Sequence, residues 1–227
     1  MKIVAINGSP NGADGTTGST LAAVLESAAA AGADTELFEL GTLSVGPCIS
    51  CYTCQRTGEC VIDDDYQEIK AAMLAADGII FATPNYIYNV SAQIKALLDR
   101  SFSMIHCQSL HGKYGACVLA TGGPGFQMPE DYLMHITGIF GYWKVGSLVV
   151  AGMQLADADR RKEALADAAA LGRRLAEAIK NQQRFPEQEE ARMQTFEGMR
   201  WMVEQEKKNW PYEYNYWQTH WGKADTE

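Results

Sequence analysis

Short apolar runs rich in β-branched residues alternate along the chain with longer segments whose apolar positions recur every three to four residues. The runs predict buried strands, because a strand covered on both faces is apolar at almost every position. The longer segments predict helices with one apolar face. We expect strands near residues 2–7, 35–39, 78–83, 114–120 and 145–150. We expect helices near residues 18–31, 65–76, 90–105, 129–140 and 156–182.

This alternation of strands and helices is typical of an α/β fold, in which helices cover both faces of a parallel sheet. Five strands favour a flavodoxin-like, doubly wound sheet with the order 2-1-3-4-5. We expect residues 1–183 to form this domain and residues 184–227 to form a helical, aromatic extension. The aromatic side chains of the extension would expose much apolar surface in water. We therefore expect an oligomerisation arm, in a homodimer or a homotetramer.

Length, charge and cysteine content narrow the classes of function. A chain of 227 residues can build one α/β core and an extension. Its net charge of -9 disfavours nucleic acid as a partner, because binding would need a concentrated positive face. The sequence has neither a signal-peptide core nor the ~18 apolar residues that cross a membrane. Four of the six cysteines lie close together, which suits a reducing compartment, so we expect the protein in the cytoplasm.

The loop after the first strand carries the residue types of a phosphate site. It covers residues 7–20, is rich in glycine and hydroxyl side chains, and leads directly into a helix. Backbone N–H groups, the helix dipole and hydroxyl donors together favour an anion there. The expected contacts are Ser9, Thr17, Gly18, Ser19 and Thr20. The loop lacks the glycine spacing of a dinucleotide fold and the lysine of a Walker loop, and a loop that only caps the helix is the alternative.

Two further loops follow the third and fourth strands. The residues of interest in them are Pro84, Asn85, Tyr86, Ile87 and Tyr88, and then Thr121, Gly122 and Gly123. In an open parallel sheet, the carboxyl ends of strands one, three and four meet at the crevice where ligands bind. A planar ring such as an isoalloxazine needs apolar cover and amide donors, which these loops offer. The alternative is an aromatic pair, Tyr86 and Tyr88, that only seals the end of the sheet.

The chain resembles the NAD(P)H-dependent FMN reductase and iron-sulfur flavoprotein superfamily over roughly residues 1–150. The motifs that carry the resemblance are Gly8-Ser9-Pro10, Thr83-Pro84-Asn85-Tyr86 with Val90-Ser91 and Asp99-Arg100 downstream, and Thr121-Gly122-Gly123. The resemblance implies that Ser9, Ser19 and Thr20 hold the FMN phosphate, residues 84–88 the ribityl chain and ring, and residues 121–123 the ring edge. It also implies an enzyme in which FMN takes a hydride from NAD(P)H and passes electrons to a quinone, a free flavin or another small-molecule acceptor.

A cysteine-rich loop at residues 47–61 follows the second strand. Cys48, Cys51, Cys54 and Cys60 have the spacing Cys-x2-Cys-x2-Cys-x5-Cys. Gaps of two residues let a short loop wrap its thiolates around one cubane, so this spacing favours a 4Fe-4S cluster. By the resemblance, such a cluster passes electrons to FMN. Free or disulfide-bonded thiols and a structural zinc ion are the alternatives.

Two other functions compete with the enzyme. One is an iron-sulfur flavoprotein that carries electrons between protein partners, linked to a ferredoxin-type protein, without oxidising NAD(P)H directly, and an acidic surface suits such docking. The other is a non-redox module that has lost FMN. Among the remaining residues, we expect Cys107 and Cys117 to be buried thiols, Lys95, Asp99 and Arg100 to pair on a helix surface, and Asp63, Asp64 and Asp65 to cap a helix.

Overall fold

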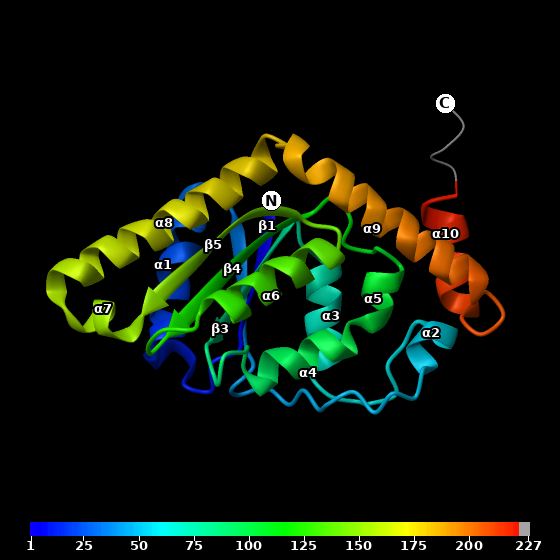
Figure 1. The fold of residues 1–227 in the computed structure, drawn as a ribbon, viewed down its shortest axis with the longest axis horizontal. Helices are drawn as coiled ribbons and strands as arrows, with labels where there is room; N and C mark the ends of the chain where they lie inside the picture. Colours follow the sequence, from blue (N-terminus) through cyan, green and yellow to red (C-terminus); the bar gives the residue numbers. More distant parts are fainter. Residues whose placement is uncertain (223–227) are drawn as a thin grey trace.

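We analysed a computed structural model of the chain, which describes residues 1–222. Residues 223–227, the end of the expected extension, lie outside the described residues. The strands are β1 (Lys2–Asn7), β2 (Asp34–Glu39), β3 (Gly78–Pro84), β4 (Tyr114–Thr121) and β5 (Trp143–Ala151). They form a parallel five-stranded sheet in the order β2-β1-β3-β4-β5 (Figure 1). The flavodoxin-like order is therefore confirmed, and the strands lie close to their expected ranges.

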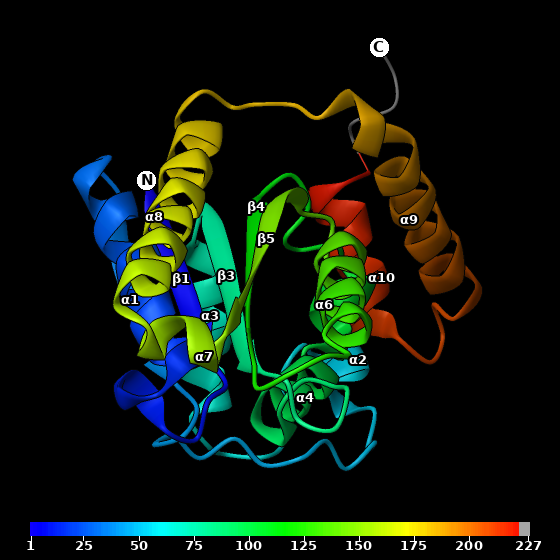
Figure 2. The same ribbon diagram turned by 60° about the vertical axis from the view of Figure 1, so that its left-hand side comes forward.

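Helices cover both faces of the sheet (Figures 1 and 2). One layer consists of α1 (Thr16–Ala30) and α8 (Ala158–Lys180). The other layer contains α3 (Tyr66–Ala75), α4 (Ala92–Arg100) and α6 (Gln127–Ile139). Because side chains alternate along a strand, β1 supplies both cores: Val4 and Ile6 face the second layer, whereas Ile3 faces the first.

The expected helix over residues 90–105 is wrong in one respect. The structure has two helices there, α4 and α5 (Phe102–His106), separated at Ser101. The Tyr66 hydroxyl donates to the carbonyl of Arg100 at 2.7 Å, and the Ser101 hydroxyl donates to the carbonyl of Leu97 at 2.9 Å. Both bonds engage helix carbonyls and favour a bend. Three short helices were not predicted: the 3₁₀ helix Gly12–Asp14, α2 (Thr53–Thr57) and α7 (Gly152–Ala156).

The extension contains α9 (Pro186–Gln205) and α10 (Pro211–His220), which return to the core on the side of α5 and α6 (Figure 2). The Trp217 indole donates to the carbonyl of His106 at 2.9 Å, and the Trp221 indole donates to that of Cys107 at 3.0 Å. Much of the aromatic surface is thus covered by the same chain, although Trp201 remains 67% exposed. An oligomerisation arm stays a prediction. Among residues 1–222, no helix is long and apolar enough to cross a membrane.

Candidate functional site

Three loops meet at the carboxyl end of the sheet. The N–H of Gly8 donates to the carbonyl of Ala82 at 2.7 Å, which joins the first loop to β3. The N–H of Asn85 donates to the carbonyl of Ala120 at 2.7 Å, and its side-chain amide donates to Thr121 Oγ1 at 3.3 Å. These bonds join the second loop to the third. The loops that carry Ser9, Tyr86 and Gly122 therefore share one rim, here called the loop rim (Figure 1).

The first loop presents the amino terminus of α1. The cap residue Gly15 provides no side-chain hydrogen bond, and the first turn contains no acidic residue. The first N–H groups of a helix have no partner within the helix, so the start of α1 can receive an anion. A Cβ on Gly18 would lie only 2.1 Å from the carbonyl oxygen of Gly12, so this glycine lets the loop pack closely on the helix. Two of the expected phosphate contacts, Ser9 and Thr17, are also buried.

The hydroxyls of Ser19 and Thr20 are engaged elsewhere. Ser19 Oγ donates to the carbonyl of Gly15 at 3.0 Å, and Thr20 Oγ1 donates to that of Thr16 at 2.7 Å. Thr20 is also completely buried. These two side chains stabilise the first turn of α1, so the main-chain N–H groups of that turn are the donors to consider for an anion. Their role as phosphate contacts stays a prediction.

The second loop contains a tight turn with an unusual backbone. Ile87 and Tyr88 have φ values of 50° and 60°, and the N–H of Asn89 donates to the carbonyl of Tyr86 at 3.1 Å. Two central residues with positive φ define a type I′ turn, which normally takes asparagine and glycine. Ile87 is 94% exposed at its tip, and Tyr86 and Tyr88 are also exposed. Pro84, by contrast, is the buried last residue of β3.

The third loop leaves open space beside its backbone. A Cβ on Gly122 or Gly123 would meet no atom within 4 Å, and neither glycine has a positive φ. Packing and conformation therefore do not require glycine at these positions. Thr121 Oγ1 donates to the carbonyl of Gly123 at 2.8 Å and fixes the loop. Nearby, Asn85 Oδ1 is buried and has no hydrogen-bond partner among the described residues.

The four clustered cysteines line a single cavity of about 360 Å³, here called the cysteine cavity. Its wall also includes Arg100 and Phe102, at the end of α4 and the start of α5. None of the four thiols forms a disulfide. Ser50 and Tyr52, between the first three cysteines, have φ values of 55° and 57°, and the N–H of Ser50 donates to Cys48 Sγ at 3.4 Å. The loop thus curls its cysteines toward a common space.

Arg100 holds the far side of the cysteine cavity. The surface pairing expected for Arg100 is wrong, because the side chain is 3% exposed and binds Asp64 with both terminal nitrogens, at 2.9 and 3.1 Å. Its Nε donates to Cys60 Sγ at 3.1 Å. Only Lys95 and Asp99 pair on the helix surface as expected. Asp64 also accepts from the N–H of Tyr66, the first residue of α3, at 3.1 Å while it neutralises Arg100. The cap residue of α3 is Asp65, which forms no side-chain cap bond, so the capping expected from these aspartates is confirmed only in the bond of Asp64.

The surroundings of the thiols shift their pKa values in opposite directions. Hydrogen bonds from Thr53, with a smaller contribution from Arg56, lower the pKa of Cys51. Burial raises the pKa of Cys54 to about 11, with further contributions from the Glu213 carboxylate and the other three cysteines. Cys107 and Cys117 are buried as predicted, and burial raises the pKa of each to about 12. The thiols of the cysteine-rich loop therefore lie close enough to repel one another when ionised.

Within residues 1–222, no three His, Cys, Asp or Glu side chains already surround one point as ligands of a single metal ion. A tetrahedral zinc site would need every sulfur within about 2.3 Å of one ion. A 4Fe-4S cluster binds its thiolates to different iron atoms, so it is larger than a single ion and needs a cavity between them. The cluster expected at these cysteines stays a prediction, and so does the zinc alternative.

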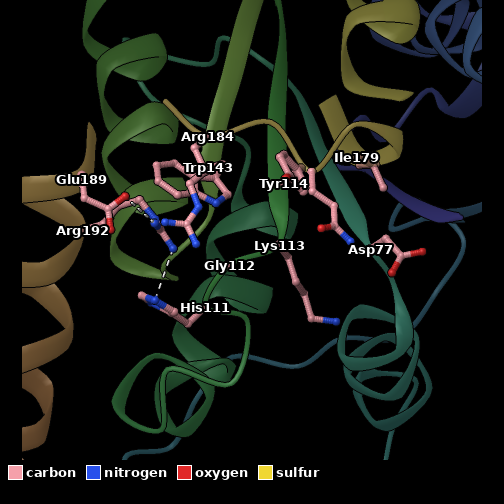
Figure 3. Close-up of a pocket in the computed structure, with 11 residues that line it drawn as sticks. Asp77, His111, Gly112, Lys113, Tyr114, Trp143, Ile179, Arg184, Glu189 and Arg192 are labelled. Atoms are coloured by element: carbon pink, nitrogen blue, oxygen red, sulfur yellow. Dashed lines mark hydrogen bonds and ion pairs between the residues drawn. The ribbon is translucent and has the colours of Figure 1, made fainter. Parts of the chain in front are cut away.

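Another cavity, of about 510 Å³, lies at the opposite end of the sheet. Its wall includes Tyr114 and Trp143, the first residues of β4 and β5, and Arg192 from α9. Figure 3 shows Arg192 beside Trp143 and joined to His111. The guanidinium carbon lies 3.6 Å from the centre of the Trp143 ring, and Nη2 lies 3.3 Å from His111 Nε2. This cavity is far from the loop rim and connects the core to the extension.

Comparison with known proteins gives these loops a context. Residues 1–156 match the sequence profile of the family described as NADPH-dependent FMN reductase. The chain belongs to this family. It is an FMN-dependent, NAD(P)H-dependent flavin oxidoreductase of the FMN reductase type. This confirms the family resemblance and the enzyme class expected from the sequence.

The curated relatives of this family member include iron-sulfur flavoproteins. One from Archaeoglobus fulgidus is 33% identical over 201 residues, which cover 86% of this chain and 88% of that protein. One from Methanosarcina thermophila is 42% identical over 146 residues, or 61% and 75% of the two chains. Among solved structures, an NADH:FMN oxidoreductase in its apo form aligns with a TM-score of 0.58 at 24% identity, covering 76% of this chain and 88% of that one. The structural likeness establishes the shared fold.

Proposed function

We propose that this flavin oxidoreductase binds FMN at the loop rim and a 4Fe-4S cluster at Cys48, Cys51, Cys54 and Cys60. The phosphate would lie at the amino terminus of α1, against the main chain of residues 16–18 and the side chains of Ser9 and Thr17. The ribityl chain and ring would lie against residues 84–88. The ring edge would lie against Thr121, Gly122 and Gly123.

Three observations support the fit of FMN to the loop rim. The start of α1 is uncapped by side chains and free of acidic groups, which suits a phosphate. The open space beside Gly122 and Gly123 allows a ring to approach the backbone closely. The buried Asn85 Oδ1 can accept a hydrogen bond from a ligand. When bound, FMN supplies a ring that accepts a hydride and returns electrons.

The protein's own residues would orient the ligands. The α1 terminus neutralises the phosphate, and Tyr86, Ile87 and Tyr88 cover apolar surface and exclude water from the ring. The exposed tip of their loop leaves room for a nicotinamide to approach. No side chain is needed to transfer a proton to or from a substrate in this arrangement.

The cysteine cavity is the observation that carries the cluster. Its four thiols and the N–H groups of Ser50 and Arg100, which donate to Cys48 Sγ and Cys60 Sγ, suit an anionic iron-sulfur centre. When bound, a 4Fe-4S cluster supplies one-electron transfer. The helix α4 begins at Ser91 in the loop rim and ends at Arg100 in the cavity wall, so it connects the two sites.

An absorption spectrum of anaerobically purified protein, with iron and acid-labile sulfide analysis, tests both cofactors. We expect flavin bands, a broad shoulder in the visible blue and about four irons per chain. The Cys51→Ser variant should keep FMN and lose iron. Flavin bands without iron in the wild-type protein would contradict the proposed cluster and leave a simple FMN reductase. A colourless protein that cannot take up added FMN would contradict the loop-rim site.

The electron acceptor follows from where electrons can leave the protein. We propose a small-molecule acceptor, such as a quinone or a free flavin, at the exposed loop rim, in a cytoplasmic homodimer or homotetramer.

The second candidate function, a carrier linked to a ferredoxin-type protein, is favoured by the exposed Ile49, Tyr52 and Phe102 around the cysteine cavity. Anaerobic stopped-flow mixing separates the two. Rapid flavin bleaching by NADH or NADPH supports the enzyme, whereas bleaching only by reduced ferredoxin supports the carrier.

A further inference from the structure

The carboxyl-terminal helix α10 packs on the short helix α2, which carries Cys54 (Figure 1). The two helices are separated by more than 150 residues of sequence, yet they lie side by side at the edge of the cysteine cavity. Trp210, at the cap position of α10, stacks on His106 with 4.9 Å between the ring centres. The bonds of Trp217 and Trp221 to α5 and to Cys107 hold the same helix in place. This docking brings the tail to the cysteine-rich loop.

The end of α2 lies close to α10 at Gly58. This residue ends α2 with a φ of 83°, and it lies between Cys54 and Cys60. A Cβ there would lie 2.4 Å from the ring of Tyr212, the second residue of α10. The ring of Tyr212 therefore occupies the space beside Gly58 that a larger residue would fill. The segment from Cys54 to Cys60 therefore packs against α10 through Gly58 and the ring of Tyr212.

Buried polar groups face this interface from both helices. Gln55 is completely buried, and neither atom of its side-chain amide has a hydrogen-bond partner among the described residues. Glu213 is also completely buried, with Oε2 at 2.9 Å from His106 Nδ1 and Oε1 without a partner. Unpartnered buried groups are costly. Both packed helices thus carry a buried side chain whose hydrogen bonding is incomplete.

We propose that α10 is part of the cluster site, with Tyr212 and Glu213 as positioning residues that hold the segment from Cys54 to Cys60. The aromatic extension then has a function within its own chain. This inference rests on the proposed cluster. If the cluster binds only when the cysteine-rich loop is ordered, its binding stabilises α10 in the docked position. By the same linkage, docking of α10 strengthens binding of the cluster. Glu213 is completely buried on α10, the helix that packs on the Cys54-bearing helix α2.

The test compares iron retention in matched variants of the anaerobically purified holoprotein. Tyr212→Ala removes the ring beside Gly58, and Tyr212→Phe keeps it. Tyr214→Ala is the control, because Tyr214 is on the same helix but lines a groove against α9. We expect Tyr212→Ala to lose iron to a chelator about tenfold faster than the wild type, with FMN content unchanged. Tyr212→Phe and Tyr214→Ala should behave as the wild type.

Two further variants separate positioning from a general loss of structure. Gly58→Ala displaces the Tyr212 ring from the other side of the interface and should also accelerate iron loss. Glu213→Gln removes a buried carboxylate from the helix that packs on α2, so the midpoint potential of the cluster should rise and its EPR spectrum should change, while the flavin potential stays the same. These readouts would not move if α10 only stabilised the fold.

Different results overturn different claims. Iron uptake by the wild type with equal rates of loss in Tyr212→Ala and Tyr214→Ala would overturn the role of α10 and leave the proposed cluster intact. A wild-type protein that binds FMN but takes up no iron would overturn the proposed cluster and this inference together. Equal cluster potentials in the wild type and Glu213→Gln would exclude Glu213 as a positioning residue.

Discussion

Ile87 and Tyr88 adopt a backbone conformation that side chains of their kind avoid. Positive φ costs a β-branched residue on the order of 1–3 kcal/mol, and such conformations are concentrated at ligand sites. The exposed Ile87 makes no compensating core contact. We infer that stability is lost at this turn in favour of the proposed cover for the flavin, in keeping with the trade-off between activity and stability.

Ile87→Asn tests this trade-off. Asparagine tolerates positive φ, so we expect the variant to gain about 1 kcal/mol in the free energy of unfolding of the FMN-free protein. We also expect FMN to bind more weakly, because the ring loses apolar cover. Denaturant unfolding and a fluorescence titration with FMN measure the two effects. A variant that loses stability would contradict the assignment of strain to this turn.

Arg100 is the second residue with a clear energetic role. Arg100→Lys keeps the charge but cannot reproduce the two-nitrogen contact with Asp64 or the bonds to Gly46, Ile62 and Cys60. We expect a loss of about 2–4 kcal/mol in the free energy of unfolding. Lys95→Ala on the exposed face of the same helix should cost less than about 1 kcal/mol. Equal losses in urea unfolding would mean that the buried network contributes no more than the surface pair.

The comparison of these two basic residues shows where the sequence is informative. Spacing along one helix correctly predicted the Lys95–Asp99 pair, because both side chains lie on adjacent turns. The partner of Arg100 is Asp64, which lies before another helix and is brought near only by the packed core. Local spacing cannot detect such a pair. The four cysteines were detectable because their chemistry and spacing are confined to one loop.

Among helices and loops, the start of α1 is the proposed site of the FMN phosphate. Gly18→Ala would place a methyl group 2.1 Å from the carbonyl oxygen of Gly12, so the loop must move away from the helix. Overpacking of this kind costs about 1–3 kcal/mol, which corresponds to FMN affinity about 5-fold to 150-fold weaker. Ser19→Ala should change the affinity by less than about threefold, since its hydroxyl serves the helix. Isothermal titration with FMN measures both, and a larger effect of Ser19→Ala would restore its hydroxyl as a phosphate contact.

Helix boundaries were predictable only where local sequence determines them. The apolar periodicity of residues 90–105 continues through Ser101 and predicted one helix. The break between α4 and α5 is favoured by Tyr66, a residue distant in sequence whose hydroxyl donates a hydrogen bond to the carbonyl of Arg100. The helix ends before β3 and β5 were closer to expectation, because turn residues follow the apolar pattern there.

For the complete chain, the sheet was predictable and the docking of the extension was not. Strands buried on both faces leave continuous apolar runs in the sequence. The extension lacks an equally clear pattern, since Arg192 and Val203 are the buried residues of α9, and Glu213 and Trp217 are those of α10. Its attachment uses indole, guanidinium and carboxylate groups, whose partners lie in remote parts of the chain.

The junction between core and extension should make the fold sensitive to acid. Burial, and then the nearby Arg192, lower the pKa of His111 to about 4. Between that pKa and about 6.5 the unfolded chain binds the additional proton, so the free energy of unfolding falls as pH falls through this window. The contribution is about 1–3 kcal/mol. This contribution of His111 to the free energy of unfolding is fully present above its pKa in the unfolded chain, about 6.5, and is lost below its pKa in the folded protein, about 4.

His111→Gln removes this titration and keeps an oxygen that can accept from Arg192. We expect the difference in melting temperature between pH 7 and pH 4.5 to be smaller in the variant than in the wild type. His135→Gln, at a partly exposed position on α6, is the control and should leave that difference unchanged. Identical pH dependence in all three proteins would remove His111 as the acid-sensitive group.

The distance in sequence between the cysteine-rich loop and α10 has a consequence for biosynthesis. A ribosome that has synthesised the sheet and all four cysteines has not yet made α10, the helix proposed to hold the segment from Cys54 to Cys60. Iron delivered to such a nascent chain would meet an incomplete site. Insertion of the proposed cluster is therefore expected to follow the synthesis of α10, so that shorter nascent chains retain little iron.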